Sequence, residues 1–327
     1  MISQLKSLFV RSPHLIGIFC VIGAVTTFST QDMAIKWLSG DYPLHEIILA
    51  RAAVALIFTL AVFIPLEGGM TVVRTKRLPM HLLRGLAVVI ANMTFFTGLA
   101  SLPLAEATAI FFVAPLLITV LSIPLLGEKV GLRRMLAVLV GLVGVAIMVR
   151  PAGSTFQWAA LLPLAAALAY ALLQIMTRKL GMQERASTMA FYIQLTFVMV
   201  SSTIGIVAGD GKFSGSDSPQ LEFLFRAWVL PSMGDALIMG GVGFSSAIGG
   251  YLISQAYRQS EAALVAPFEY VALPMAVFWS VMIFSDWPDA YAWVGIALIF
   301  GAGVYTFYRE AVKGKRNVLE KPMPRNR

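Results

Sequence analysis

The chain has 327 residues, of which 58% are hydrophobic and only 13% are charged. Charged residues make up about a quarter of an ordinary soluble domain, so this composition excludes a soluble protein and indicates a single polytopic membrane domain. The net charge of +8 does not indicate a nucleic-acid partner, because the basic residues lie between hydrophobic segments and in the C-terminal tail.

Ten segments of the chain are apolar over the length of a membrane crossing. A transmembrane helix needs about 20 mostly apolar residues, with a usual range of roughly 17 to 25. Short linkers separate the segments, except for a charged connection at 73–77 and a Gly/Ser/Asp-rich one at 210–219. The sequence therefore predicts an all-α membrane protein with ten transmembrane helices, at residues 14–38, 43–64, 79–100, 103–126, 132–149, 156–180, 186–209, 231–257, 260–284 and 289–309.

Lysine and arginine are distributed unevenly between the two sides of this arrangement. With both termini inside, the outer side keeps Arg150, Lys212 and Arg226, while Lys36 and Arg51 lie within helices. The positive-inside rule therefore predicts a multi-pass protein with both termini cytoplasmic, in a bacterial-type inner (plasma) membrane. The cytoplasmic side would hold Lys6, Arg11, Arg74, Lys76, Arg77, Arg84, Lys129, Arg133, Arg134, Arg178, Lys179, Arg185, Arg258 and the tail from Arg309 to Arg327.

The two halves of the chain repeat one order of features, in which an acid near a helix start precedes a proline and then a short acidic loop. Five helices per copy is an odd number, so the second copy is inverted relative to the first. We predict two inverted five-helix repeats at 1–150 and 151–310, followed by a basic cytoplasmic tail at 311–327. The matching stretches are Leu104-Ala105-Glu106-Ala107, Pro115 and Gly127-Glu128-Lys129 in the first half, and Ser260-Glu261-Ala262-Ala263, Pro267 and Ser285-Asp286-Trp287 in the second.

These motifs resemble the EamA-type transporters of the drug/metabolite transporter superfamily. The resemblance rests on LPLAEATAIFFVAPLL and GEKVGLRRMLAVLVGLVGV in the first half, and on SEAALVAPFEY and GIALIFGAGVYTFYRE in the second. It implies secondary transport of a small organic metabolite such as an amino acid or amine, often by export, although some members import riboflavin or a nucleoside-linked cofactor. The second copy departs from the family's Gly-Glu pattern at Ser285-Asp286, so a hinge role for that acid would make the two gates inequivalent.

Three charged residues lie at depth in the first two predicted helices. Asp32 and Lys36 are four residues apart and share one helix face, and Arg51 can reach the same layer. Ionisable groups at such depth usually face a cavity or a partner. One interpretation is direct contact with substrate or protons, and the other is a structural charge cluster with Lys36 extended towards the outer surface.

Glu269 lies eight residues beyond Glu261, about 12 Å deeper at 1.5 Å per residue. Pro267 removes a backbone donor just before Glu269 and Tyr270, which favours a locally unwound stretch that faces a polar cavity. Glu269 is therefore our first candidate for binding a substrate ammonium group or for exchanging protons, and the alternative is a buried structural hydrogen bond. Glu106 and Glu261 occupy first turns, where one interpretation is that the acid only favours the positive end of the helix dipole. Glu106, and Tyr270 beside Glu269, are also candidates for substrate binding or coupling.

Further polar groups lie at depth in four other predicted helices. Amides and hydroxyls at such positions commonly bridge membrane helices, and their spread also fits a shared polar pocket. The candidates for substrate contact are Asn92, Gln174 and Gln255, with Tyr170, Tyr192 and Gln194 as further polar groups.

Several chemical signatures are missing from the sequence. It has no Gly-rich phosphate loop with Lys-Ser, no HExxH and no GxSxG, and Cys20 is its single cysteine. We therefore expect no catalytic residues, no metal, no cofactor and no enzymatic activity, and a gradient as the energy source.

The leading hypothesis is an exporter of a small organic metabolite that works by alternating access in the lipid bilayer, either coupled to protons or driven by the solute's own gradient. The alternative is an importer of a vitamin such as riboflavin. A membrane-embedded lipid enzyme and a non-transporting sensor are the remaining classes, and the absent signatures and short tail disfavour both.

Overall fold

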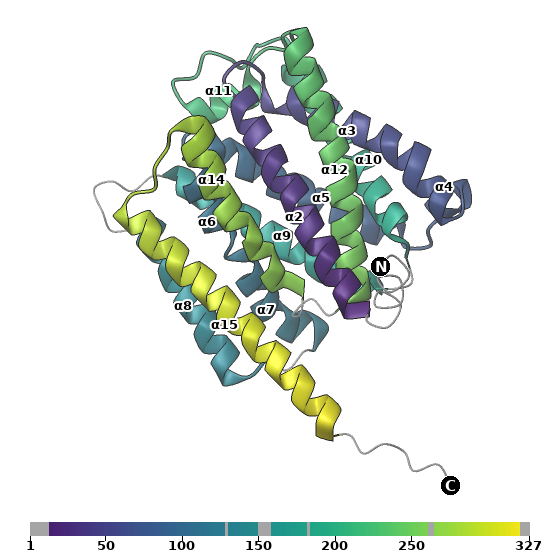
Figure 1. Ribbon diagram of the computed structural model, residues 1–327. Helices are drawn as coiled ribbons and strands as arrows, with labels where there is room; N and C mark the ends of the chain where they lie inside the picture. The colour runs from purple at the N-terminus through teal and green to yellow at the C-terminus, as the bar shows by residue number, and fades with distance from the viewer. Residues whose placement is uncertain (1–12, 128–129, 150–157, 182–183, 261–264, 321–327) are drawn as a thin grey trace.

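The computed structural model describes residues 13–127, 130–149, 158–181, 184–260 and 265–320, which contain helices and loops but no β-strand. The helices run roughly along one direction in a single bundle (Figure 1). In chain order, they are α2 (Pro13–Leu38), α3 (Leu44–Phe58), the π-helical η1 (Thr59–Phe63), α4 (Ile64–Glu67), the 3₁₀ η2 (Met70–Val73), α5 (Leu78–Leu99), α6 (Leu104–Phe111), α7 (Ala114–Leu126), α8 (Leu132–Val149), the 3₁₀ η3 (Trp158–Ala160), α9 (Leu161–Leu180), α10 (Ala186–Ala208), α11 (Pro219–Phe225), α12 (Met233–Gln259), the 3₁₀ η5 (Ala266–Val271), α14 (Ala272–Phe284) and α15 (Ala290–Glu320).

The chain is an all-helical, multi-pass membrane protein, as its composition predicts. Within the described residues, seven stretches are long and apolar enough to cross a membrane: Ile16–Leu38, Leu44–Glu67, Leu78–Leu99, Leu104–Leu126, Trp158–Leu180, Ala186–Ala208 and Met233–Arg258. The remaining predicted segments correspond to the shorter apolar helices Met135–Val149, Phe268–Phe284 and Ala290–Tyr305. The count of ten crossings stays a prediction.

Helices that are distant in the sequence pack together. The most extensive pairs are α2 with α12, α5 with α9, and α8 with α15, and Figure 1 shows α2 beside α12 and α8 beside α15. Helix α3 lies against both α10 and α12, and α6 lies against α14. The core is therefore built between the halves of the chain rather than within each half.

We call the two ends of the bundle the Lys36 end and the Arg84 end. At the Lys36 end, the Lys36 ammonium at the end of α2 donates to the Leu102 carbonyl, just after α5, at 2.7 Å. At the Arg84 end, Arg84 in the first two turns of α5 donates through Nε to Oγ1 of Thr177, in the last turn of α9, at 3.0 Å.

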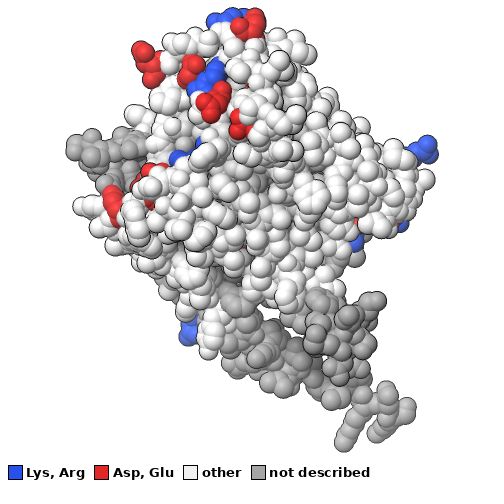
Figure 2. Space-filling model, turned by 45° about the horizontal axis from the view of Figure 1, so that its top comes forward, with Lys and Arg blue, Asp and Glu red and all other residues white. Residues whose placement is uncertain are grey.

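The Lys36 end also holds α11, a short helix that the sequence analysis did not predict. Its Phe223 side chain is buried in the core, while Gln220 donates to Ser101 Oγ at 2.6 Å. The first turn of the neighbouring α12 is capped because Ser232 Oγ accepts from the Asp235 backbone N–H at 3.2 Å. In Figure 2, acidic and basic side chains gather towards this end, and most of the remaining described surface in that view carries neither, as a lipid-facing surface should.

Helices α7 and α14 end in the same backbone conformation. Gly127 after α7 has φ 71° and ψ 20°, and Ser285 after α14 has φ 57° and ψ 20°. Glycine adopts this left-handed region without a steric penalty, whereas an L side chain there costs about 1–2 kcal/mol. Ser285 is the one residue other than glycine with positive φ among the described residues, so the second helix end carries strain that the first avoids.

Reciprocal substitutions at these two exposed positions should therefore have opposite effects. We expect Ser285→Gly to stabilise the protein by about 1 kcal/mol and Gly127→Ser to destabilise it by a similar amount. Thermal unfolding of the detergent-purified protein measures both variants. Shifts of the same sign would contradict the assigned helix ends.

Candidate functional site

A cavity of about 160 Å³ lies between helices from both halves of the chain. Residues of α2, α3, α5, α6, α9, α10, α12, η5 and α14 line it. Phe95, Phe111 and Phe112 contribute aromatic walls. The polar and charged lining residues are Ser29, Gln31, Asp32, Arg51, Asn92, Thr108, Tyr170, Gln174, Gln194, Ser246 and Glu269.

Glu269 reaches the cavity from η5, and its side chain is buried. Its Oε1 accepts a hydrogen bond from the Tyr257 hydroxyl of α12, and its Oε2 accepts from the Tyr170 hydroxyl of α9 at 3.1 Å. Both carboxylate oxygens are thus satisfied by neutral donors. No cation contacts this carboxylate in the described part of the chain, so only the two hydroxyls stabilise its charge when it is ionised.

The backbone around Glu269 departs from a regular α-helix. Residues Ala266–Val271 form the 3₁₀ helix η5, which continues into α14. Pro267 cannot donate a backbone hydrogen bond, so the α-helical pattern is interrupted there. This local departure from the α-helix was expected from the sequence, and it brings Glu269 between α9 and α12.

Arg51 brings a positive charge to the same cavity from α3. Its side chain is 2% exposed, its Nη1 donates to Asn92 Oδ1 at 2.9 Å, and its guanidinium lies 4.5 Å from the centre of the Phe197 ring. Asp32 also lines the cavity and interacts electrostatically with Arg51. The cavity therefore combines two acids and one guanidinium.

Lys36 is placed away from this cavity, in contacts that the spacing from Asp32 does not reveal. Its ammonium donates to the carbonyls of Leu102 and Leu99, at 2.7 and 3.5 Å. It also lies 5.4 Å from the centre of the Phe284 ring and interacts electrostatically with Asp286. Lys36 thus ties α2 to the start of α6 and to the end of α14.

The structure separates the other predicted site residues into two groups. Asn92 and Gln174 line the cavity with Asp32, Arg51 and Glu269, whereas four predicted residues are not in its lining. Those four are Gln255, which accepts from Arg258 Nε at 2.8 Å; Tyr270, which is buried against Phe112; Glu106, which is half-buried in the first turn of α6; and Lys36. Glu261 lies outside the described residues.

The sequence analysis missed Tyr257, which donates to Glu269. The two residues lie on different helices, and a tyrosine near the end of an apolar helix is common at membrane interfaces. Gln31, Ser246 and Thr108 were missed as well, because single polar residues in apolar helices carry no local signal of the cavity they face.

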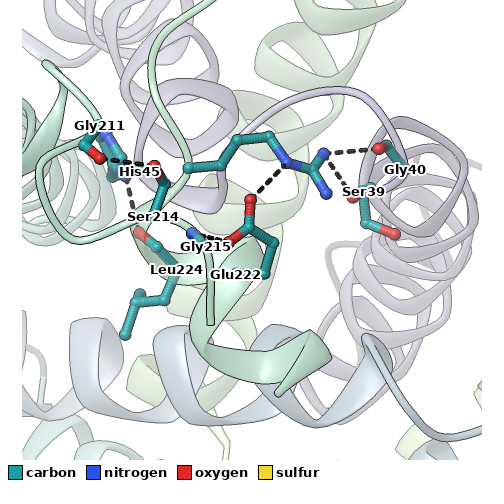
Figure 3. A network of polar contacts seen from close by, with 9 residues as sticks. Ser39, Gly40, His45, Gly211, Ser214, Gly215, Glu222 and Leu224 are labelled. Carbon is teal, nitrogen blue, oxygen red and sulfur yellow. Dashed lines mark hydrogen bonds and ion pairs between the residues drawn. The ribbon is translucent and has the colours of Figure 1, made fainter. Parts of the chain in front are cut away.

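Polar contacts close the bundle at the Lys36 end. Arg226 donates to the Gly40 carbonyl, and its Nε lies 3.7 Å from Glu222 Oε1. Figure 3 shows Glu222 between this guanidinium and Gly215, with Ser39 and Gly40 opposite. A second contact joins Tyr42, whose hydroxyl donates to Asp235 Oδ2 at 2.9 Å. The loop between α2 and α3 is thereby fixed to α11 and α12.

A different set of contacts closes the Arg84 end. Glu67 of α4 accepts from Ser187 Oγ at 2.7 Å and from the Tyr251 hydroxyl at 2.8 Å. Glu184 accepts from Thr75 Oγ1 at 2.6 Å through its side chain and from Arg258 at 3.0 Å through its carbonyl. These contacts join α4 and the following loop to α10 and α12.

No group of three or more metal-ligating side chains occurs within the described ranges. The polar lining of the cavity instead offers a guanidinium, two carboxylates, amides and hydroxyls. Such a set can bind a polar organic solute by charge and hydrogen bonding.

Comparison with known proteins finds a matching family and several similar transporters. Residues 15–150 match the EamA-like transporter family. The S-adenosylmethionine uptake transporter of Rickettsia prowazekii is 25% identical over 91% of this chain and 94% of the relative, and the riboflavin transporter of Vibrio cholerae is 26% identical over 91% and 92%. The pseudopaline exporter of Pseudomonas aeruginosa is 23% identical over 86% and 93%.

A solved structure, titled only "Crystal structure of protein", has the same fold, with a TM-score of 0.66 and 20% identity over 93% of this chain and 99% of that chain. The names of the relatives describe transporters that differ in solute and in direction, and none describes an enzyme. The expectations of a family resemblance and of a transporter rather than an enzyme are therefore confirmed.

Two tyrosine-to-phenylalanine variants test the hydrogen bonds of Glu269. Tyr257→Phe removes a donor to a buried carboxylate and should destabilise the protein by about 1.5–3 kcal/mol. Tyr270→Phe is the matched control, because the Tyr270 hydroxyl is buried without a hydrogen-bond partner among the described residues, and it should be neutral or stabilising. Thermal unfolding compares them, and equal losses would contradict the assignment.

Proposed function

We propose that the chain, whose residues 15–150 match the EamA-like transporter family, is a secondary transporter of a small organic metabolite. The observation that carries this proposal is the charged cavity between the two halves of the chain. Transporters of this general design place their substrate sites between their repeats, near the middle of the membrane. Asp32, Arg51, Asn92, Gln174 and Glu269 are its substrate-binding or coupling residues. Export of an amino acid or amine is the leading form of the proposal.

The charges of the cavity support a substrate that carries an ammonium group. Glu269 and Asp32 contribute two carboxylates and Arg51 one guanidinium, so the ionised cavity has a net negative charge. A bound cation or proton offsets this charge in a medium where water does so poorly. Glu269, which is bonded only to neutral hydroxyls, is the acid that exchanges between proton and substrate.

Import of a vitamin or cofactor-like solute is the second candidate. Its support is the cavity wall formed by Phe95, Phe111 and Phe112, which suits a flat aromatic ring. The names of two relatives, a riboflavin transporter and an S-adenosylmethionine uptake transporter, point in the same direction.

We further propose that the ten helices form two inverted five-helix repeats, with boundaries at 1–150 and 151–310. In this correspondence α2 matches α9, and α5 matches α12. The contact between α2 and α12 then corresponds to the contact between α9 and α5. These are two of the three most extensive contacts between helices. The third pair, α8–α15, maps onto itself. The shared conformation of Gly127 and Ser285 supports the same match between α7 and α14.

The directions of two helix starts support the inversion. Helix α6 begins at the Lys36 end, beside Leu102. Ser260, which precedes the corresponding segment of the second half, lies at the Arg84 end, where its carbonyl accepts from Arg178 at 3.4 Å. Repeats of parallel orientation would place both starts at one end.

Alternating access then requires the two closed ends to open in turn. The contacts of Arg226 and Tyr42 hold the Lys36 end, and those of Glu67 and Glu184 hold the Arg84 end. The Arg226 contact is exposed and the other three are partly buried. Such hydrogen bonds contribute about 0.5–3 kcal/mol each, so substrate binding can offset the loss of one set.

Cysteine labelling tests the proposed orientation, in which both termini and the Arg84 end face the cytoplasm. In a Cys20→Ser background, Ser216→Cys should react from outside intact cells with a membrane-impermeant maleimide, and Gly131→Cys should react only after permeabilisation. Both positions lie between helices. The reverse pattern would contradict this topology.

Proteoliposome uptake tests transport and the coupling role of Glu269. Wild-type protein should accumulate at least one solute from a metabolite panel, at a rate that depends on pH. Glu269→Gln imitates the protonated acid with little change of shape, so the pH dependence should become flat while the protein still folds. Asp210→Asn changes an exposed acid after α10 that lies outside the cavity lining and makes none of the closing contacts, so it is the control and should keep the wild-type profile. Unchanged pH dependence in Glu269→Gln would exclude Glu269 as the coupling acid.

A further inference from the structure

The guanidinium of Arg51 has one edge without a partner. Its Nη1 donates to Asn92, but Nε and Nη2 are buried and have no hydrogen-bond partner among the described residues. These two nitrogens form the side edge of a guanidinium, where two N–H groups point in parallel. This edge matches the two oxygens of a carboxylate in a bidentate pair.

Arg51 belongs to the wall of the cavity in which a solute would bind. Asn92 and the Phe197 ring fix its guanidinium from two other directions. Asp32 interacts with Arg51 electrostatically but does not occupy Nε or Nη2. A buried charged N–H group without an acceptor costs free energy. A solute that supplies an acceptor at this edge removes that cost when it binds.

The other charges of the cavity restrict which anion fits. Glu269 and Asp32 already place two carboxylates in the lining, and a doubly charged phosphate would be repelled by both more strongly than a singly charged carboxylate. A solute that carries a cationic group as well relieves the charge on Glu269. The two recognition points then lie on α3 and on η5, which belong to different halves of the chain.

We infer that Arg51 binds the carboxylate of the transported solute, so that the substrates are carboxylates bearing a cationic group rather than simple amines. This inference rests on the proposed transport function and names the substrate class of the same cavity. It makes Arg51 the residue that determines specificity, with Asn92 positioning its guanidinium.

Paired probes test this inference in proteoliposomes with the full-length protein. The probes are L-lysine with cadaverine, L-phenylalanine with phenethylamine, and L-tryptophan with tryptamine, each pair differing only in the carboxylate. Wild-type protein should move at least one amino acid about 10- to 100-fold faster than its amine at limiting concentration, the range expected for a charged hydrogen-bonded pair. Arg51→Lys keeps the positive charge but removes the two parallel N–H groups, so it should reduce this preference. Arg51→Gln should abolish it.

Arg84→Lys is the matched control. Arg84 is as deeply buried as Arg51, but it lies at the end of the bundle, outside the cavity lining. The variant should therefore keep the wild-type preference even if it lowers stability. Loss of preference in Arg84→Lys as well would assign the effect to a buried arginine in general and overturn the inference.

Other outcomes separate the inference from the function on which it rests. Equal transport of amines and amino acids by the wild-type protein, or transport of riboflavin alone, would overturn the role of Arg51 and leave the transporter intact. Arg51-dependent transport of O-phosphoethanolamine in preference to the amino acids would assign the edge to phosphate and overturn it too. A wild-type protein that moved none of the probes, riboflavin and S-adenosylmethionine included, would overturn the proposed function itself.

Discussion

A carboxylate at mid-depth in a membrane protein must find its hydrogen bonds within the protein, because lipid supplies none and water reaches it poorly. Glu269 meets this constraint with two tyrosine hydroxyls, Tyr170 from α9 and Tyr257 from α12. The position of η5 thus depends on helices from two other parts of the chain. Pro267 interrupts the α-helical pattern where this approach is needed. One buried acid thereby links the local backbone, the packing between helices and the cavity.

Arg51 obeys the same constraint but meets it only in part. Asn92 takes one nitrogen and the Phe197 ring supports the guanidinium, while Nε and Nη2 have no partner among the described residues. Arg51 lines the same cavity as Asp32 and Glu269. A site made for stability alone would have paired that edge. Lys36 differs from Arg51, because two backbone carbonyls, a phenylalanine ring and the charge of Asp286 surround its ammonium group. Lys36 therefore holds the end of the bundle, whereas Arg51 is available for binding.

Much of the fold follows from the sequence, because an apolar stretch of the right length has few alternatives to a helix in a membrane. The depth of Asp32, Arg51, Asn92, Gln174 and Glu269 was predictable for the same reason, and all five line the cavity. Their partners were not. Tyr257 reaches Glu269 from a different helix, Arg51 reaches Asn92 across 41 positions, and Lys36 binds carbonyls more than 60 positions away. Such pairs depend on how helices pack, which no local pattern encodes. Helix α11 was missed because it is short and polar at its start.

The central claim is that the cavity between Arg51 and Glu269 is where the transported solute binds. The most direct measurement is an experimental structure of the protein in lipid, determined with a solute that it demonstrably transports. We expect density for the solute between these two side chains, with an anionic group at Nε and Nη2 of Arg51 and with the Tyr170 and Tyr257 contacts to Glu269 rearranged or shared. Density at another place, such as the contact between α8 and α15, with this cavity empty, would contradict it.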